Sequence, residues 1–272
     1  MGSFSELFSV KEVLNSKGFE VISEGDCSDL LIPLKYLQRS DQDILFDAFN
    51  DQRSRSELLH KINDPKFIVT NPAALSLINH NKFISDRNKY STSFEWYAGE
   101  LMGRKFSSFS SSYSVEVKDV FRNNITETTG DYDAIVILRD LNFIYFECKT
   151  GTFNADKILK AFERAIALHC EFSVILVQSA INLNSLRACI KGITHRFISE
   201  LELYQIGIKG NPASNVIGWN TCFFASAEGN IEEQLRTIMR INAAKKLSHS
   251  YSWGMSDEDY EKMGYIRNLI SS

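Results

Sequence analysis

No stretch of this sequence is apolar for long enough to cross a lipid bilayer, so no membrane-spanning helix is expected. The first residues also lack the basic flank and the apolar centre of a signal peptide. The five cysteines are scattered, and none of them belongs to a Cys-x-x-Cys pair, which argues against a zinc site. Together these absences predict a cytoplasmic protein with free thiols and no membrane contact.

An excess of basic residues is absent as well. The chain has 30 Lys and Arg residues against 34 Asp and Glu residues, which gives a formal net charge of -4. This balance argues against a protein that coats nucleic acid without specificity. It does not argue against a nuclease, because metal ions supply positive charge to a site that is built from carboxylates. The 272 residues, 44% of them hydrophobic, suffice for one large domain or two small ones.

What the sequence does contain is a pair of strand-like runs joined by a short polar turn. Residues 134–138 and 143–146 are β-branched or aromatic, a pattern that predicts two buried strands. Three acids and a lysine stand at the ends away from the turn: Asp131, Asp133, Glu147 and Lys149. Side chains alternate between the faces of a strand, so Glu147 and Lys149 share one face while Cys148 points to the other.

The length of the turn decides which of these side chains meet. A turn made of residues 139–141 would set Asp133 opposite Glu147 and Asp131 opposite Lys149. Clustered carboxylates repel each other, and a cation relieves that repulsion. The spacing therefore favours a divalent metal between Asp133 and Glu147, with Lys149 beside it.

The order of an Asp, a hairpin and Glu-x-Lys resembles the PD-(D/E)XK nuclease superfamily. The segment Phe146-Glu147-Cys148-Lys149-Thr150-Gly151 is most similar to the nuclease domain of the Card/Can-type CRISPR effectors, which cyclic oligoadenylates activate. The resemblance extends over residues 91–180. It implies an α/β fold with a restriction-endonuclease-like core, in which helices flank a central mixed β-sheet. The elements of that core follow the order helix, three strands, helix, strand.

The resemblance also implies an activity. Such a protein hydrolyses phosphodiester bonds in DNA or RNA as an endonuclease, here with a role in bacterial defence. Mg²⁺ or Mn²⁺ would be held by Asp133, Glu147 and the Cys148 carbonyl, since hard cations prefer oxygen ligands. Lys149 would orient the attacking water or stabilise the developing negative charge. No proline precedes the aspartate as the family pattern requires, so Asp131 stays an alternative ligand; we favour Asp133, because the buried run begins directly after it.

The family places a further carboxylate on the helix before the first strand. Residues 94–102 predict an amphipathic helix, and Glu95 matches best because it follows an aromatic residue early in that helix. Thr92-Ser93-Phe94-Glu95 also has the spacing of a capping box, in which Glu95 would only cap the helix. Glu100 is the other candidate for this position.

The helix expected after the motif carries cations on one face. Asn154 is placed to cap a helix that runs to His169. Lys157, Lys160 and Arg164 follow at helical spacing and therefore share a face. These cations either hold a backbone phosphate or form a solvated surface, and the sequence leaves both interpretations open.

The chain is expected to divide near residue 90. Residues 1–90 predict a mainly helical accessory segment, and residues 91–272 the nuclease-like domain. The accessory segment is either a helical cap on the core, which we favour, or a recognition or dimerisation module that would form a homodimer. It does not resemble the sensor domain of the CRISPR effectors, so activation by cyclic oligoadenylates is not expected.

Two other interpretations of the motif remain. The chain could be a catalytically silent member of the fold that binds nucleic acid or serves as an assembly subunit. Alternatively, Lys149 could simply neutralise Asp131 and Glu147 at the edge of a sheet. Three acids and a lysine that converge on one place favour an active site over both alternatives.

Overall fold

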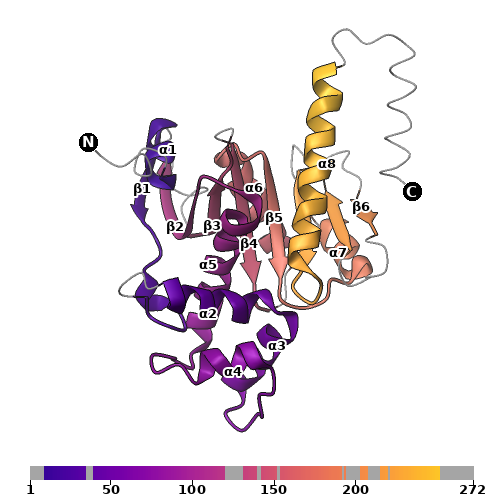
Figure 1. The fold of residues 1–272 in the computed structure, drawn as a ribbon. Helices are drawn as coiled ribbons and strands as arrows, with labels where there is room; N and C mark the ends of the chain where they lie inside the picture. Colours follow the sequence, from indigo (N-terminus) through magenta and orange to yellow (C-terminus); the bar gives the residue numbers. More distant parts are fainter. Residues whose placement is uncertain are drawn as a thin grey trace. The chain divides into compact units, whose positions relative to one another are not determined.

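The computed structural model describes residues 9–34, 39–119, 131–139, 142–151, 154–191, 193, 203–207, 215–219 and 221–251. Eight strands are hydrogen-bonded in the order β1-β2-β3-β4-β5-β8-β7-β6, and helices flank this mixed sheet (Figure 1). The fold is therefore the α/β class with an N-terminal helical segment that the sequence predicts. Among the described residues, no helix combines the length and the apolar character needed to span a membrane.

The chain groups into two compact units, which are described separately. The first unit holds residues 1–150 and 160–173, and the second holds residues 151–159 and 174–272. The residues of the accessory segment belong to the first unit, together with the strands of the motif.

The first unit begins with short elements that are set by capping side chains. These elements are α1 (Val10–Ser16), β1 (Phe19–Ser23), η1 (Cys27–Asp29), α2 (Arg39–Asn50), α3 (Gln52–Asn63) and α4 (Pro72–Ile78). Asn71 accepts hydrogen bonds from the backbone N–H groups of Ala73 and Ala74, and Pro72 fills the first turn of α4. This beginning of α4 is the one that the Asn-Pro pair predicts.

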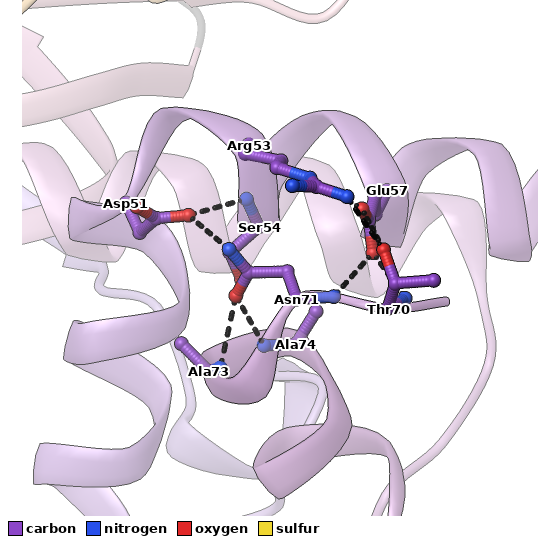
Figure 2. A network of polar contacts seen from close by, with 8 residues as sticks. All are labelled: Asp51, Arg53, Ser54, Glu57, Thr70, Asn71, Ala73 and Ala74. Atoms are coloured by element: carbon purple, nitrogen blue, oxygen red, sulfur yellow. Dashed lines mark hydrogen bonds and ion pairs between the residues drawn. The ribbon is translucent and has the colours of Figure 1, made fainter.

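A polar network joins α3 to the segment that leads into α4 (Figure 2). The Glu57 carboxylate accepts the backbone N–H groups of Thr70 at 2.6 Å and Asn71 at 2.8 Å, and the side chain of Arg53 at 2.9 Å. Burial alone would raise the pKa of Glu57, but these bonds lower it to about 2. Asn71 also donates to Asp51, the N-cap of α3, so one network fixes the starts of both helices.

Helix α5 (Arg87–Phe106) begins earlier than the helix predicted over residues 94–102. The Asp86 side chain caps it by accepting from the N–H of Lys89. Glu95 therefore lies well inside the helix, and the alternative in which Glu95 only caps the helix is excluded. The helix contacts β2, β3 and β4 and also α2 and α3. Its buried aromatic residues reach the helical segment, as where the ring of Tyr90 lies 5.2 Å from that of Phe49.

The three strands of the motif region are antiparallel neighbours: β2 (Ser110–Asp119), β3 (Asp131–Ile137) and β4 (Phe143–Lys149). Ala134 pairs with Phe146, and the same register runs to the turn, where the N–H of Leu138 donates to the Asn142 carbonyl at 2.9 Å. The pairing thus reaches Leu138 and Asn142 and leaves residues 139–141 between them, as the predicted register requires. Residues 107–112 are rich in serine, which predicts a turn over this range; the turn is shorter, because β2 already begins at Ser110.

The remaining elements follow the motif along the chain. They are α6 (Ala155–Ala167), β5 (Phe172–Val177), α7 (Leu183–Lys191), β6 (Leu203–Ile206), β7 (Val216–Trp219), β8 (Cys222–Ser226) and α8 (Ile231–Tyr251). The apolar run 216–224 predicts one strand, but the structure divides it between β7 and β8, which pair antiparallel. In the second unit, Gln234 of α8 bonds both the N–H and the carbonyl of Ser226 and so fixes the end of β8. The pattern of residues 256–269 predicts a last helix, and this range lies outside the described residues.

Candidate active site

Asp133, Glu147 and Lys149 come together at the ends of β3 and β4 that lie away from the turn. The register that pairs Ala134 with Phe146, continued by one residue, sets Asp133 opposite Glu147. Lys149 Nζ lies 3.3 Å from Asp133 Oδ2 and also forms an ion pair with Glu147 Oε1. Both acids are buried, with exposed fractions of 9% and 5%. One ammonium group therefore bridges two carboxylates in a region of low dielectric constant.

The backbone of the neighbouring strand fixes Asp133. The N–H of Cys148 donates to Asp133 Oδ2 at 2.6 Å. Burial and the charge of Glu147 raise the pKa of Asp133 to about 7, although Lys149 and the Cys148 N–H act in the opposite direction. A carboxyl group with this pKa is only partly ionised at neutral pH, and an added cation would favour its ionised form.

Helix α5 brings Glu95 to the same place. Ser114 of β2 donates its hydroxyl to Glu95 Oε2 at 2.7 Å. Burial and the nearby charge of Asp133 raise the pKa of Glu95 to about 8. Glu100 instead pairs with Arg104 at 3.0 Å, one turn further along the helix. The structure thus brings Glu95 into the electrostatic neighbourhood of Asp133, and Glu100 makes a different contact.

The two candidate aspartates have different surroundings. Asp131 is exposed and pairs across the strands with Glu116 of β2. Although the residue is exposed, partial desolvation of its carboxyl group and the charges of Glu116 and Glu147 raise the pKa of Asp131. Asp133 is the aspartate that is buried and paired with Lys149, so the geometry favours it as the ligand.

Two residues that the sequence interpretation did not place in the site hold the other oxygen of Glu147. Tyr145 donates its hydroxyl to Glu147 Oε2, and Arg164 Nη1 of α6 lies 3.5 Å from the same oxygen and 3.3 Å from the tyrosine oxygen. Tyr145 precedes Glu147 by two residues in β4, so strand alternation could have indicated it. The Arg164 guanidinium also lies over the ring of Tyr132, 5.2 Å from its centroid.

Arg164 is therefore neither a solvated cation nor a free phosphate contact. Its side chain is only 6% exposed. Lys157 and Lys160 on the same helix are exposed. Only these two of the three predicted cations therefore lie on the surface, because Arg164 is buried.

The donor set can be tested against the predicted metal. Among the described residues, no group of three or more His, Cys, Asp and Glu side chains is arranged to share one ion. Two carboxylates do share one cation, the Lys149 ammonium, and their hard oxygen donors suit Mg²⁺ or Mn²⁺. Asp133 and Glu147 would supply the side-chain ligands, with water or phosphate oxygens completing the shell. The metal, the Cys148 carbonyl as its ligand, and the role of each residue stay predictions.

Comparison with known proteins adds no family. No family model matches the sequence, and no curated protein matches it. Four chains of solved structures match. One is the crystal structure of protein VC1899 from Vibrio cholerae, which is 13% identical, with 65% of this chain and 54% of that chain covered and a TM-score of 0.37. This chain thus spans about half the length of that protein, and so low a likeness carries no argument about function.

Proposed function

We propose that this chain is a metal-dependent nuclease that hydrolyses phosphodiester bonds in DNA or RNA as an endonuclease. The observation that carries the proposal is the Lys149 bridge between the buried acids Asp133 and Glu147. Burying charges in this way costs desolvation free energy, and titratable groups perturbed in this manner gather at functional sites. The element order α5, β2, β3, β4, α6, β5 supports the proposal, since the resemblance to PD-(D/E)XK nucleases implies it.

Hydrolysis of a phosphodiester needs an activated water and stabilisation of charge on the phosphate and the leaving oxygen. Bound Mg²⁺ or Mn²⁺ supplies both. Asp133 and Glu147 would hold the ion. Lys149 Nζ, now on both carboxylates, can turn to a water or a phosphate oxygen and orient it. Glu95, whose pKa is about 8, can accept or release a proton near neutral pH.

The test is incubation of the purified protein with plasmid, single-stranded DNA and RNA, each in Mg²⁺, Mn²⁺ or EDTA. We expect cleavage of at least one substrate with metal and none with EDTA. Glu147→Gln should abolish cleavage. Glu100→Gln is the matched control, because Glu100 pairs with Arg104 on the same helix as Glu95 and should not affect the rate. A folded wild type that cuts no substrate, or a Glu147→Gln variant that cuts normally, contradicts the proposal.

The second candidate function is a catalytically silent subunit that binds nucleic acid. The complete neutralisation of Asp133 and Glu147 by Lys149 and Arg164 favours it, since such a network also serves stability alone. In that case the protein would bind nucleic acid without cutting it, and metal would leave its melting temperature unchanged.

The proposal also covers the cellular location, the biological role and the oligomeric state of the protein. None of the five cysteines, all of which are described, forms a disulfide bond, which fits a reducing cytoplasm. A part in bacterial defence is proposed from the resemblance. A homodimer belongs to the alternative in which residues 1–90 form a dimerisation module and not a helical cap. Gel filtration tests whether the protein is a homodimer. Phage challenge of cells that carry the wild type or Glu147→Gln tests the part in defence.

A further inference from the structure

Strand β2 contains an unusual backbone conformation at Ser114. Its φ of 45° lies in the left-handed region, which residues other than glycine rarely adopt. Among the described non-glycine residues, Ser107 and His169 share a positive φ. Those two residues follow the ends of α5 and α6, where left-handed backbone is common. Ser114 instead lies inside a strand, where no helix end explains its conformation.

The position of Ser114 relates this conformation to the candidate site. Tyr113 pairs with Ala134 and Val115 pairs with Tyr132, so Ser114 lies beside Asp133 in the sheet. Its hydroxyl donates to Glu95 Oε2 at 2.7 Å. The strained residue thus donates to the acid of α5 and lies beside the acid of β3 in the sheet.

We propose that Ser114 is a positioning residue of the active site: the left-handed bend of β2 directs its hydroxyl to the Glu95 carboxylate and holds that carboxylate beside Asp133. The inference rests on the proposed function. Backbone strain of this kind persists where the surrounding structure enforces it, and it gathers at functional sites. Ser112 of the same strand lacks a positive φ, and it donates its hydroxyl to the exposed Glu24.

Two substitutions separate the hydroxyl from the strain. Ser114→Ala removes the hydroxyl and keeps a side chain in the left-handed region, whereas Ser114→Gly removes the hydroxyl and relieves the strain. Each should lower kcat by about 10–100-fold, the usual loss when a group that orients a ligand is removed, with little change in KM. The glycine variant should melt at a higher temperature than the alanine variant. Inside a strand, a glycine variant usually melts at a lower temperature than the corresponding alanine variant, so this expected order is reversed.

Ser112→Ala and Ser112→Gly are the matched controls in the same strand. Both should keep the wild-type kcat, and the alanine variant should melt at the higher temperature. Normal kcat in both Ser114 variants would overturn the positioning role. A Ser114→Gly variant that melts at a lower temperature than Ser114→Ala would overturn the inference that the backbone at Ser114 is strained.

A wild type that cuts no substrate would refute the proposed function and leave Ser114 to be judged by stability. Unfolding of Ser114→Ala, Glu95→Gln and the double variant then forms a cycle. Non-additive melting shifts support the contact between Ser114 and Glu95, and additive shifts overturn it.

Discussion

At the scale of single residues, Glu147 has a different partner on each oxygen. Lys149 pairs with Oε1, while Tyr145 and Arg164 hold Oε2. The partners on Oε2 come from the same strand and from α6, and they fix the direction of the carboxylate. Lys149 also contacts Asp133, so it is the partner best placed to serve a reaction.

Lys149→Ala should therefore slow turnover by roughly 10²–10⁴-fold, the usual contribution of a positioned acid, base or charge-stabilising group. Affinity for nucleic acid should change little, because phosphate contacts elsewhere supply most of it. Cleavage rate and substrate binding are measured separately at saturating Mn²⁺. A variant that cuts normally would remove Lys149 from the mechanism. One that cuts slowly only because it no longer binds would make Lys149 a phosphate contact.

Arg164 should act on stability as well as on activity. Arg164→Met removes the donor that contacts both the Tyr145 oxygen and Glu147 Oε2, and Oε2 then keeps only the Tyr145 hydroxyl, so the substitution should lower the free energy of unfolding by about 1.5–3 kcal/mol. Lys160→Met, at an exposed position of the same helix, should change it by less than about 0.5 kcal/mol. Urea titrations of both variants measure the difference. Equal effects would mean that the Arg164 contacts contribute no net stability.

At the scale of elements, the network around Glu57 holds the start of α4 to α3. Glu57→Gln removes the charge that accepts these bonds and should cost about 1.5–3 kcal/mol at pH 7. The folded protein lowers the pKa of Glu57 to about 2 from its usual 4.5. Its contribution is therefore complete above about pH 4.5 and is lost as the pH falls towards 2.

Urea unfolding of wild type and Glu57→Gln across this pH range tests the linkage. The two stability curves should converge at the acid end. Glu20→Gln serves as the control, because Glu20 is largely exposed and should show no such convergence. A constant difference between wild type and Glu57→Gln would place the effect in packing.

Some of these elements could be predicted from sequence, and others could not. The hairpin was predictable because turn length and strand alternation together fix which side chains face each other, as with Asp133 and Glu147. The start of α5 was not, because Asp86 and Thr92 are both plausible caps and only packing decides between them. The Arg164 contact depends on how α6 packs against the strands, and helical periodicity gives only the face. Nothing in a serine residue predicts the left-handed backbone of Ser114.

At the scale of the whole molecule, metal binding should be visible in stability. An ion that binds only the folded protein stabilises it by mass action, so Mn²⁺ should raise the melting temperature. At 100 times its dissociation constant, Mn²⁺ should raise the free energy of unfolding by about 2.7 kcal/mol. Glu147→Gln should lose this gain, and Glu100→Gln should keep it. Thermal melts in Mn²⁺ and in EDTA measure it. An equal rise in melting temperature in the wild type, Glu147→Gln and Glu100→Gln would mean that Mn²⁺ binds at another site.

The acids and cations of the candidate site are spread along the sequence from Glu95 to Arg164, and all of them belong to the first unit. A growing chain therefore holds only fragments of the site until α6 has left the ribosome and has packed against β3 and β4. Domains fold as units during synthesis, so the charges would converge in one late step. If the proposed nuclease cuts RNA, unfinished chains would lack the assembled site and would leave intact the messenger RNA from which they are made.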